Sequence, residues 1–299
     1  MNSADIEVIK RIESRDFFAR LAPSLAIGER THFSGVYGAA ETLPPSAQER
    51  MQFASDGWFR LASIIPQTEV AAMRNAILAL DAAGVPALFA YVYDAFWQCL
   101  DAVAPRVAHL AGAVEALPDV WAWHLPRGAP VQGWRPHRGS YTRELTSDGK
   151  PALINVWIPL TDVDQRNACM WVVPRSQDAD YPNALDSHAA VAHGVPIALT
   201  AGTVMGWDAN VLHWGGDMTA TAFCPRISFS FTFRAASAHR IDAAVLPERL
   251  DFSARLQLIA DMIGIYRGQA APLPRYVLQW AKLRRTVVDA ALSRQFRQR

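Results

Sequence analysis

Cysteine and net charge are what this 299-residue chain has little of. Its cysteines, Cys99, Cys169 and Cys224, are three in number and show no CxxC spacing. This argues against a disulfide framework or a cysteine-rich zinc site and fits a reducing cytoplasm. Lys and Arg total 29 against 28 Asp and Glu, a formal net charge of +1. Such a balance argues against a nucleic-acid partner, whose phosphates require a basic surface.

The sequence also lacks a long apolar segment. The longest, around residues 85–93, is interrupted by Pro86 and followed by Asp94, and it is shorter than the roughly 18 residues of a membrane span. The N-terminal stretch is charged and shows no apolar core of a signal peptide. We therefore expect a cytoplasmic protein without a membrane partner. With 51% hydrophobic and 19% charged residues, the composition predicts a compact fold, and the length suits a single catalytic domain spanning 1–299.

Tryptophan, by contrast, is abundant, with ten residues, and its large ring often lines ligand pockets. Seven of the ten fall in the half of the chain that is rich in β-forming residues: Trp121, Trp123, Trp134, Trp157, Trp171, Trp207 and Trp214. We interpret these seven as walls of a pocket inside a β-barrel.

Three regions of different texture predict the architecture. Residues of about 55–113 favour a short strand and then helices over 67–83 and 86–112, the second bent or ended by Pro105. Short β-rich runs separated by turn residues fill about 115–236, and residues 227–233 alternate strictly between apolar and hydroxyl side chains. Such alternation indicates an antiparallel sandwich or barrel. From about 246–299 the pattern is helical again, with a basic tail best read as a solvated helix end. The expected fold is mainly β with flanking helices.

Four polar residues of the β-rich region form a candidate site. His137 and His213 flank predicted strands, and barrel strands bring such distant residues together. A single histidine of this kind is more often structural, and imidazole suits iron, zinc, copper and nickel alike. Arg226 and Ser228 lie two residues apart on one strand face, where a guanidinium and a hydroxyl suit a carboxylate.

With these residues in place, the chain resembles the phytanoyl-CoA dioxygenase (PhyH) family of non-haem Fe(II)/2-oxoglutarate-dependent oxygenases over roughly residues 55–235. The segments that carry the resemblance are DGWFRLASIIPQTEVAAMRNAI, NVWIPLTDVDQRNACMWVVPRSQ and GTVMGWDANVLHWGG. The turn Pro174-Arg175-Ser176-Gln177 stands where Gly-Ser-His is usual. The resemblance implies a double-stranded β-helix (jelly-roll, cupin-like) core. It also implies Fe(II) on His137 and His213, with 2-oxoglutarate on Arg226 and Ser228.

The chain departs from the family at the third metal ligand. The family usually holds iron with His-x-Asp plus a distal His, whereas position 139 is glycine. His-x-Gly resembles the iron halogenases of the superfamily, in which chloride binds the iron. The resemblance therefore implies that chloride (or bromide) binds beside Gly139 and that O2 is consumed. A chloro-Fe(IV)-oxo species would then abstract hydrogen from an unactivated carbon, with release of succinate and CO2.

Other interpretations stay open at this point. The sequence is also compatible with a hydroxylase, in which water or substrate takes the vacant position, and with an inactive binding protein. Alternatively, Glu144 or Asp217 supplies the missing carboxylate ligand. Asn155 and Trp157 share a strand face that the resemblance places toward the cosubstrate, although each also suits ordinary barrel filling.

Trp134 and Trp214, next to the two histidines, are candidates for the substrate-pocket wall. Arg138 either holds an anionic substrate or is solvated. The expected partner is a small-molecule substrate of natural-product type, free or tethered to a carrier protein.

Overall fold

The computed structural model describes residues 3–28, 31–40, 44–128, 133–139, 145–182, 188–238, 241, 244–266 and 273–297. Its helices are α1 (Ser3–Ile12), α2 (Arg15–Leu21), α3 (Ala47–Asp56), α4 (Gln67–Ala82), η1 (Ala87–Val92), α5 (Asp94–Ala111), η2 (Arg175–Gln177), η3 (Ala189–His193), α6 (Phe252–Tyr266) and α7 (Arg275–Arg297). Its strands are β1 (Thr31–His32), β2 (Trp58–Leu61), β3 (Val114–Leu125), β4 (Leu153–Pro159), β5 (Met170–Val172), β6 (Val195–Ile197), β7 (Val204–Asp208), β8 (His213–Gly215), β9 (Arg226–Ala235) and β10 (Arg249–Leu250).

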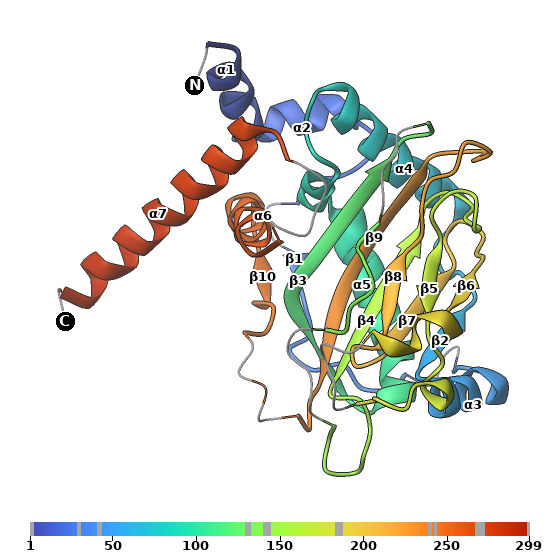
Figure 1. Cartoon of the computed structure of the whole chain (residues 1–299). Coiled ribbons are helices and arrows are strands. Elements are labelled where there is room, and N and C mark those ends of the chain that lie inside the picture. Colours follow the sequence, from blue (N-terminus) through green and yellow to red (C-terminus); the bar gives the residue numbers. More distant parts are fainter. Residues whose placement is uncertain are drawn as a thin grey trace.

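Two antiparallel sheets form the centre of the molecule (Figure 1). The larger has the strand order β2-β7-β4-β9-β3, and the smaller has the order β6-β5-β8. The long strands β3 and β9 run side by side in Figure 1 and pair from Val114↔Ala235 to Leu125↔Arg226. A two-residue strand pair, β1 and β10, lies apart from both sheets. The prediction of a mainly β, jelly-roll fold with flanking helices is confirmed.

The alternation along β9 explains how the larger sheet separates two environments. Phe229, Phe231 and Phe233 are buried in the core beneath the helices, where Phe96 of α5 meets the Phe229 ring edge-on at 5.0 Å between centroids. The residues that alternate with them along β9 carry hydroxyl groups or, in Arg226 and Arg234, guanidinium groups. They face the other way, because successive strand side chains point to opposite faces. One face of the sheet therefore packs against the helices, and the other presents polar side chains to the cavity.

The helices match the predicted regions with one correction. The helix predicted over 86–112 is two elements, η1 and α5, and the break lies at Tyr93 rather than at Pro105. Pro105 sits inside α5. Helices α1, α2 and α3 precede the region where helices were expected, and β2 joins the edge of the larger sheet through β7. Among the helices that the structure describes, none has the length and apolar character needed to cross a membrane.

Candidate active site

His137 and His213 face each other across a pair of antiparallel segments. The backbone N–H of each donates to the carbonyl of the other at 3.0 Å, and their ring centroids are 4.2 Å apart. Residues directly opposite in an antiparallel pair present their side chains on the same face. The segment that carries His137 is thus held against β8, and this pairing brings together two residues that are 76 positions apart in the sequence.

Hydrogen bonds fix the tautomer of both imidazoles. Nδ1 of His137 contacts the carbonyl of Arg135 at 2.7 Å, and Nδ1 of His213 contacts the carbonyl of Val211 at 2.8 Å. A carbonyl only accepts, so each Nδ1 carries the hydrogen and each Nε2 keeps a lone pair for a metal. Burial lowers the pKa of His137, and the pKa of His213 is lowered by burial and by the neighbouring His137. Both rings are therefore held neutral, the form that binds a metal.

No acidic side chain completes the site within the described ranges, where no group of three His, Cys, Asp or Glu is placed to hold a metal ion. The amide of Gly139 donates to the carbonyl of Ala209 at 2.7 Å. A Cβ at position 139 would lie 2.9 Å from the Ala209 Cβ. Asp217 is exposed and does not line the pocket, and Glu144 lies outside the described residues.

Arg226 is fully buried without a counter-ion in the described part of the chain. One of its guanidinium nitrogens donates to the carbonyl of Ala168 at 2.7 Å, whereas its Nε has no partner there. Burial lowers its pKa to about 10, because a buried cation loses its hydration. The Ser228 hydroxyl is likewise buried and unpartnered among the described atoms. A buried planar cation without a counter-ion and an unpartnered hydroxyl suit a bound carboxylate, as 2-oxoglutarate would provide.

A cavity of about 500 Å³ joins the histidines to Arg226. Five of the tryptophans that we predicted as barrel walls line it: Trp121, Trp123, Trp134, Trp157 and Trp207. Trp123 and Trp157 lie 5.7 and 5.9 Å from the Arg226 guanidinium carbon, measured to their ring centroids. Trp207 and Trp134 lie beside the two imidazoles, at 4.8 Å from His213 and 5.6 Å from His137. The aromatic rings thus enclose both the metal position and the carboxylate position.

Asn155 and Trp157 lie on this wall as expected. Trp157 is almost fully buried and its indole N–H has no partner among the described atoms. Asn155 contacts the hydroxyl of Thr232 at 3.0 Å, so part of its capacity for hydrogen bonds is already used.

The structure separates Trp214 and Arg138, the two remaining candidates for the substrate pocket. Trp214 is not among the residues that line the cavity; it stacks on Trp171 at 5.6 Å between ring centroids. The reason is strand alternation, since His213 points inward and its neighbour must point outward. Arg138 is not solvated, because its buried side chain pairs with Asp178 at 2.5 Å and donates to the Asn210 carbonyl at 2.9 Å. It also lines the cavity, and its Nε and one terminal nitrogen have no partner among the described atoms.

Sequence reasoning missed Asp119 and Tyr266, which also line the cavity. The Tyr266 hydroxyl donates to Asp119 at 2.7 Å. Asp119 precedes Trp121 and Trp123 at spacings of two on β3, so the alternation that placed the tryptophans could have indicated it. Tyr266 ends α6, and no local pattern signals its position.

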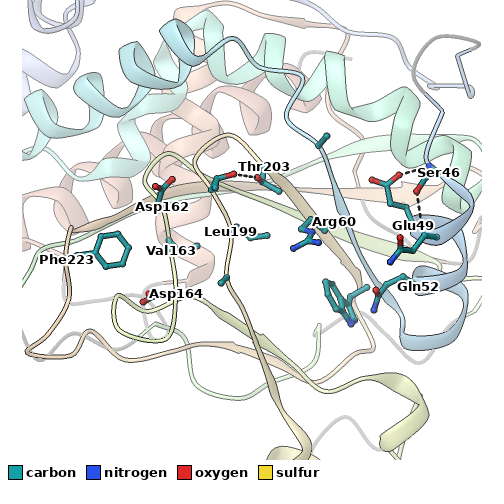
Figure 2. A pocket seen from close by; sticks show the side chains of 15 residues that line it. Ser46, Glu49, Gln52, Arg60, Asp162, Val163, Asp164, Leu199, Thr203 and Phe223 are labelled. Carbon is teal, nitrogen blue, oxygen red and sulfur yellow. Dashed lines mark hydrogen bonds between the residues drawn. The ribbon is translucent and has the colours of Figure 1, made fainter.

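A second hollow, of about 660 Å³, opens beside α3 and β2 (Figure 2). Arg60, Glu49, Asp162 and Phe223 are among its lining side chains, and the lining contains no histidine or cysteine among the described residues. Thr200 and Thr203 hydrogen-bond to each other at its edge. Arg226 and the histidine pair belong to the other cavity, which we take as the active site.

Several solved structures share this fold. SnoK, described as a non-heme alpha ketoglutarate dependent carbocyclase from nogalamycin biosynthesis, is 18% identical, with a TM-score of 0.52 over 67% of this chain and 87% of SnoK. The non-heme monooxygenase ThoJ, as its nickel complex, is 17% identical, with a TM-score of 0.51 over 74% of this chain and 97% of its own. AviO1 from Streptomyces viridochromogenes Tue57 is 16% identical, with a TM-score of 0.50 over 69% of this chain and 100% of its own. At these identities the likeness shows the fold. No curated protein sequence matches the chain significantly.

The sequence of residues 94–226 matches the family described as phytanoyl-CoA dioxygenase (PhyH). This range includes His137, Gly139, His213 and Arg226, the residues that the geometry assembles around one cavity. Two neutral imidazoles and a buried, unpaired guanidinium fit the iron and the 2-oxoglutarate that this family uses. Through these residues the chain resembles the phytanoyl-CoA dioxygenase family of non-haem Fe(II)/2-oxoglutarate-dependent oxygenases, whose family model it matches over residues 94–226.

Proposed function

We propose that this protein is an Fe(II)/2-oxoglutarate-dependent halogenase that places chlorine or bromine on an unactivated carbon of a small molecule. The observation that carries the proposal is the histidine pair without an acidic third ligand among the described residues. Glycine stands at position 139, where His-x-Asp enzymes have their carboxylate. The missing carboxylate leaves both a coordination position and a negative charge to be supplied by another group.

A halide supplies both. Two neutral imidazoles add no charge to Fe(II), and the two carboxylates of 2-oxoglutarate balance its charge. A chloride then provides the single negative charge that an aspartate would have brought. Because chloride is compact and needs no tether to the backbone, it suits a coordination position that no side chain at 139 reaches.

The residues of the cavity would bind the metal, orient 2-oxoglutarate and keep water out. His137 and His213 present Nε2 to the metal because their Nδ1 hydrogens are held by backbone carbonyls. Arg226 and Ser228 would hold the far carboxylate of 2-oxoglutarate, and the tryptophan walls would keep water from the reacting atoms. Bound iron and 2-oxoglutarate would consume O2, releasing succinate and CO2, and so supply an oxidant that takes a hydrogen from the substrate. The product then depends on placement, because a carbon nearer the halide than the oxygen would be halogenated.

The direct test compares products formed in chloride and in bromide. The iron-loaded protein is incubated with 2-oxoglutarate, O2 and a panel of small molecules, and products are identified by mass. We expect a product whose mass and isotope pattern change with the halide. A hydroxylated product that forms equally without halide would instead establish the hydroxylase alternative. Absence of substrate-triggered succinate formation across the panel would favour a binding protein.

A second test needs no substrate. Chloride is titrated into the protein loaded with Fe(II) and 2-oxoglutarate, and the charge-transfer absorption of the complex is followed. We expect saturable binding of chloride and tighter binding of 2-oxoglutarate in its presence. In the Gly139→Asp variant the carboxylate would occupy the position, and the chloride effect should disappear. Equal spectra with and without chloride in the unmodified protein would contradict the proposal.

A further inference from the structure

A carboxylate that is not placed to bind the metal faces the cavity from β3. Asp119 lies where the pairing of β3 with β9 shifts its register between Ala116 and Val120. Its two oxygens contact two hydroxyl groups, Tyr266 of α6 at 2.7 Å and Thr232 of β9 at 3.1 Å. The bulge, which adds two residues to β3 at this point, thus presents a carboxylate to the cavity between two fixed donors.

The Thr232 hydroxyl has only one hydrogen, which it can give to Asp119 or to Asn155. Both contacts are satisfied when the amide nitrogen of Asn155 donates to Thr232 and Thr232 donates to Asp119. Asp119 then accepts from two neutral groups, and both of these donors favour its ionised form. The amide oxygen of Asn155 is left facing away from Thr232.

Asp119 has no counter-ion among the residues that the structure describes, since it forms no ion pair there. Arg135 also lines the cavity, but its side chain is exposed at the rim. Burial raises the pKa of the Asp119 carboxyl, as expected of a carboxylate that has lost water without gaining a cation. A buried charge of this kind is costly unless a ligand compensates it.

Three aromatic rings surround the approach to this carboxylate. Tyr266 lies 5.5 Å from Trp121 and 5.0 Å from Trp134, and the two tryptophans lie 6.1 Å apart, all measured between ring centroids. The face of an aromatic ring is negative and attracts cations. Trp134 also borders His137, so the same wall extends from Asp119 to the metal position.

The charges of the proposed complex also favour a cationic substrate. The metal and 2-oxoglutarate balance each other, and the Arg226 cation offsets one halide anion. Asp119 then remains as an uncompensated negative charge inside the cavity. A substrate with one positive charge would make the loaded site neutral, whereas an anionic substrate would add to the repulsion.

We infer that the substrate carries a protonated amine, which Asp119 binds while Trp121, Trp134 and Tyr266 enclose its carbon skeleton. This inference rests on the proposed function in taking this cavity as the substrate site and, for the charge balance alone, in counting the halide. The amine anchors one end of the molecule at the β3 bulge and directs the rest toward the histidine pair.

The test uses the metal-free full-length protein and a matched pair of probes, 2-phenylethylamine and 2-phenylethanol, at neutral pH. Binding is measured by calorimetry and by the fluorescence of the cavity tryptophans. We expect the amine to bind about tenfold or more tightly than the alcohol. In the Asp119→Asn variant this preference should vanish, and in the control variant Asp217→Asn, whose exposed carboxylate lies outside the cavity, it should persist.

Equal binding of the two probes, or a preference that survives Asp119→Asn, would overturn the inference. Stabilisation of Asp119→Asn by 2-oxoglutarate in thermal unfolding shows that the variant is folded. The two proposals fail separately. If the protein prefers the amine but forms no halide-dependent product, the halogenase proposal is wrong. If it forms halide-dependent product but binds the two probes equally, the inference of an amine substrate is wrong.

Discussion

The methyl group of Ala209 occupies the space that a side chain at Gly139 would enter. A Cβ built on Gly139 lies 2.9 Å from the Ala209 Cβ and 3.2 Å from the Ala209 oxygen, and the same carbonyl accepts the Gly139 amide hydrogen at 2.7 Å. Two neighbouring strand segments are therefore closer here than two side chains allow. The missing carboxylate is therefore accompanied by close packing, so that a side chain added at position 139 has to displace Ala209.

We expect Gly139→Asp to destabilise the protein by about 1–3 kcal/mol through overpacking, in addition to ending halogenation. Gly139→Ala adds the same Cβ without a carboxylate, so it should show a similar loss of stability but retain halide-dependent product. Chemical denaturation and product mass are measured on both. If both variants lose halogenation equally, crowding rather than the carboxylate is responsible.

The double variant Gly139→Asp/Ala209→Gly removes the methyl group that the new Cβ would meet. We expect it to recover part of the stability lost by Gly139→Asp, less about 0.5–1 kcal/mol for the added glycine. Hydroxylated product is expected from this variant, since the aspartate has room to bind the metal. Stability no better than that of the single variant would show that the Ala209 backbone, not its methyl group, limits the site.

Replacing Arg226 tests the 2-oxoglutarate position. Arg226→Met removes the charged partner of a buried carboxylate, a loss of about 3–5 kcal/mol, so the 2-oxoglutarate requirement should rise by about a hundredfold or more. Arg226→Lys keeps the charge and should lie between. Succinate formation against 2-oxoglutarate concentration is the measurement, with thermal stabilisation by 2-oxoglutarate as the binding control. An unchanged requirement in Arg226→Met would exclude this arginine as the carboxylate partner.

The amine preference should depend on pH through Asp119. Its pKa is raised above the ordinary value of 3.8 by burial, and an alkylammonium stays protonated throughout the acidic range. Amine affinity should therefore be full above the Asp119 pKa and fall as the pH is lowered through it, at a higher pH than an exposed carboxylate would show.

The titratable groups around Asp119 do not obscure its effect on amine binding. Tyr266 and Thr232 contact Asp119 as neutral hydroxyls, and Tyr91 of η1 has a raised pKa and stays neutral. His137, across the cavity, has a lowered pKa and adds positive charge only in acid. Asp119→Asn corrects for this histidine, because it removes only the carboxylate. A pH profile identical in the two proteins would contradict the assignment.

Away from the cavity, Arg255 stabilises the junction between α5, α6 and the chain before α5. Its fully buried side chain pairs with Asp94 at 2.6 Å and donates to the carbonyls of Val92 and Leu250 at 2.7 and 3.2 Å. Arg255→Met leaves these acceptors unpaired and should cost about 3–5 kcal/mol of unfolding free energy. The comparison is Arg166→Met, which breaks a more exposed pair with Asp164 and should change stability little. Similar midpoints in urea would contradict this difference.

Local pattern was sufficient for the parts of the site that lie along one strand or within one motif. The alternation on β9 predicted which face carries Arg226 and Ser228, and the missing aspartate is visible in the sequence at Gly139. The resemblance to the family indicated His137 and His213, and the structure places these two histidines side by side.

The rest depended on pairing between distant segments. Trp207 and Trp214 look equivalent in the sequence, but only the first lines the cavity, because β8 turns Trp214 onto Trp171. The sequence around Arg138 suggested a solvated side chain, because nothing in it indicates the ion pair with Asp178, forty residues later. The alternation on β3 could have placed Asp119 on the cavity face, but the register shift beside it and its contact with Tyr266 of α6 depend on other segments.

The reciprocal backbone hydrogen bonds between His137 and His213 tie metal loading to folding. Because strand side chains alternate, a slip of one residue in this pairing would turn one imidazole out of the cavity. Only one alignment of the 133–139 segment against β8 can therefore be captured by a metal ion. Gly133 and Gly215 allow that alignment, since a Cβ on Gly133 would lie 2.5 Å from the Gly215 Cα. A metal ion bound by both histidines would therefore stabilise only the chain whose strands are in the correct register.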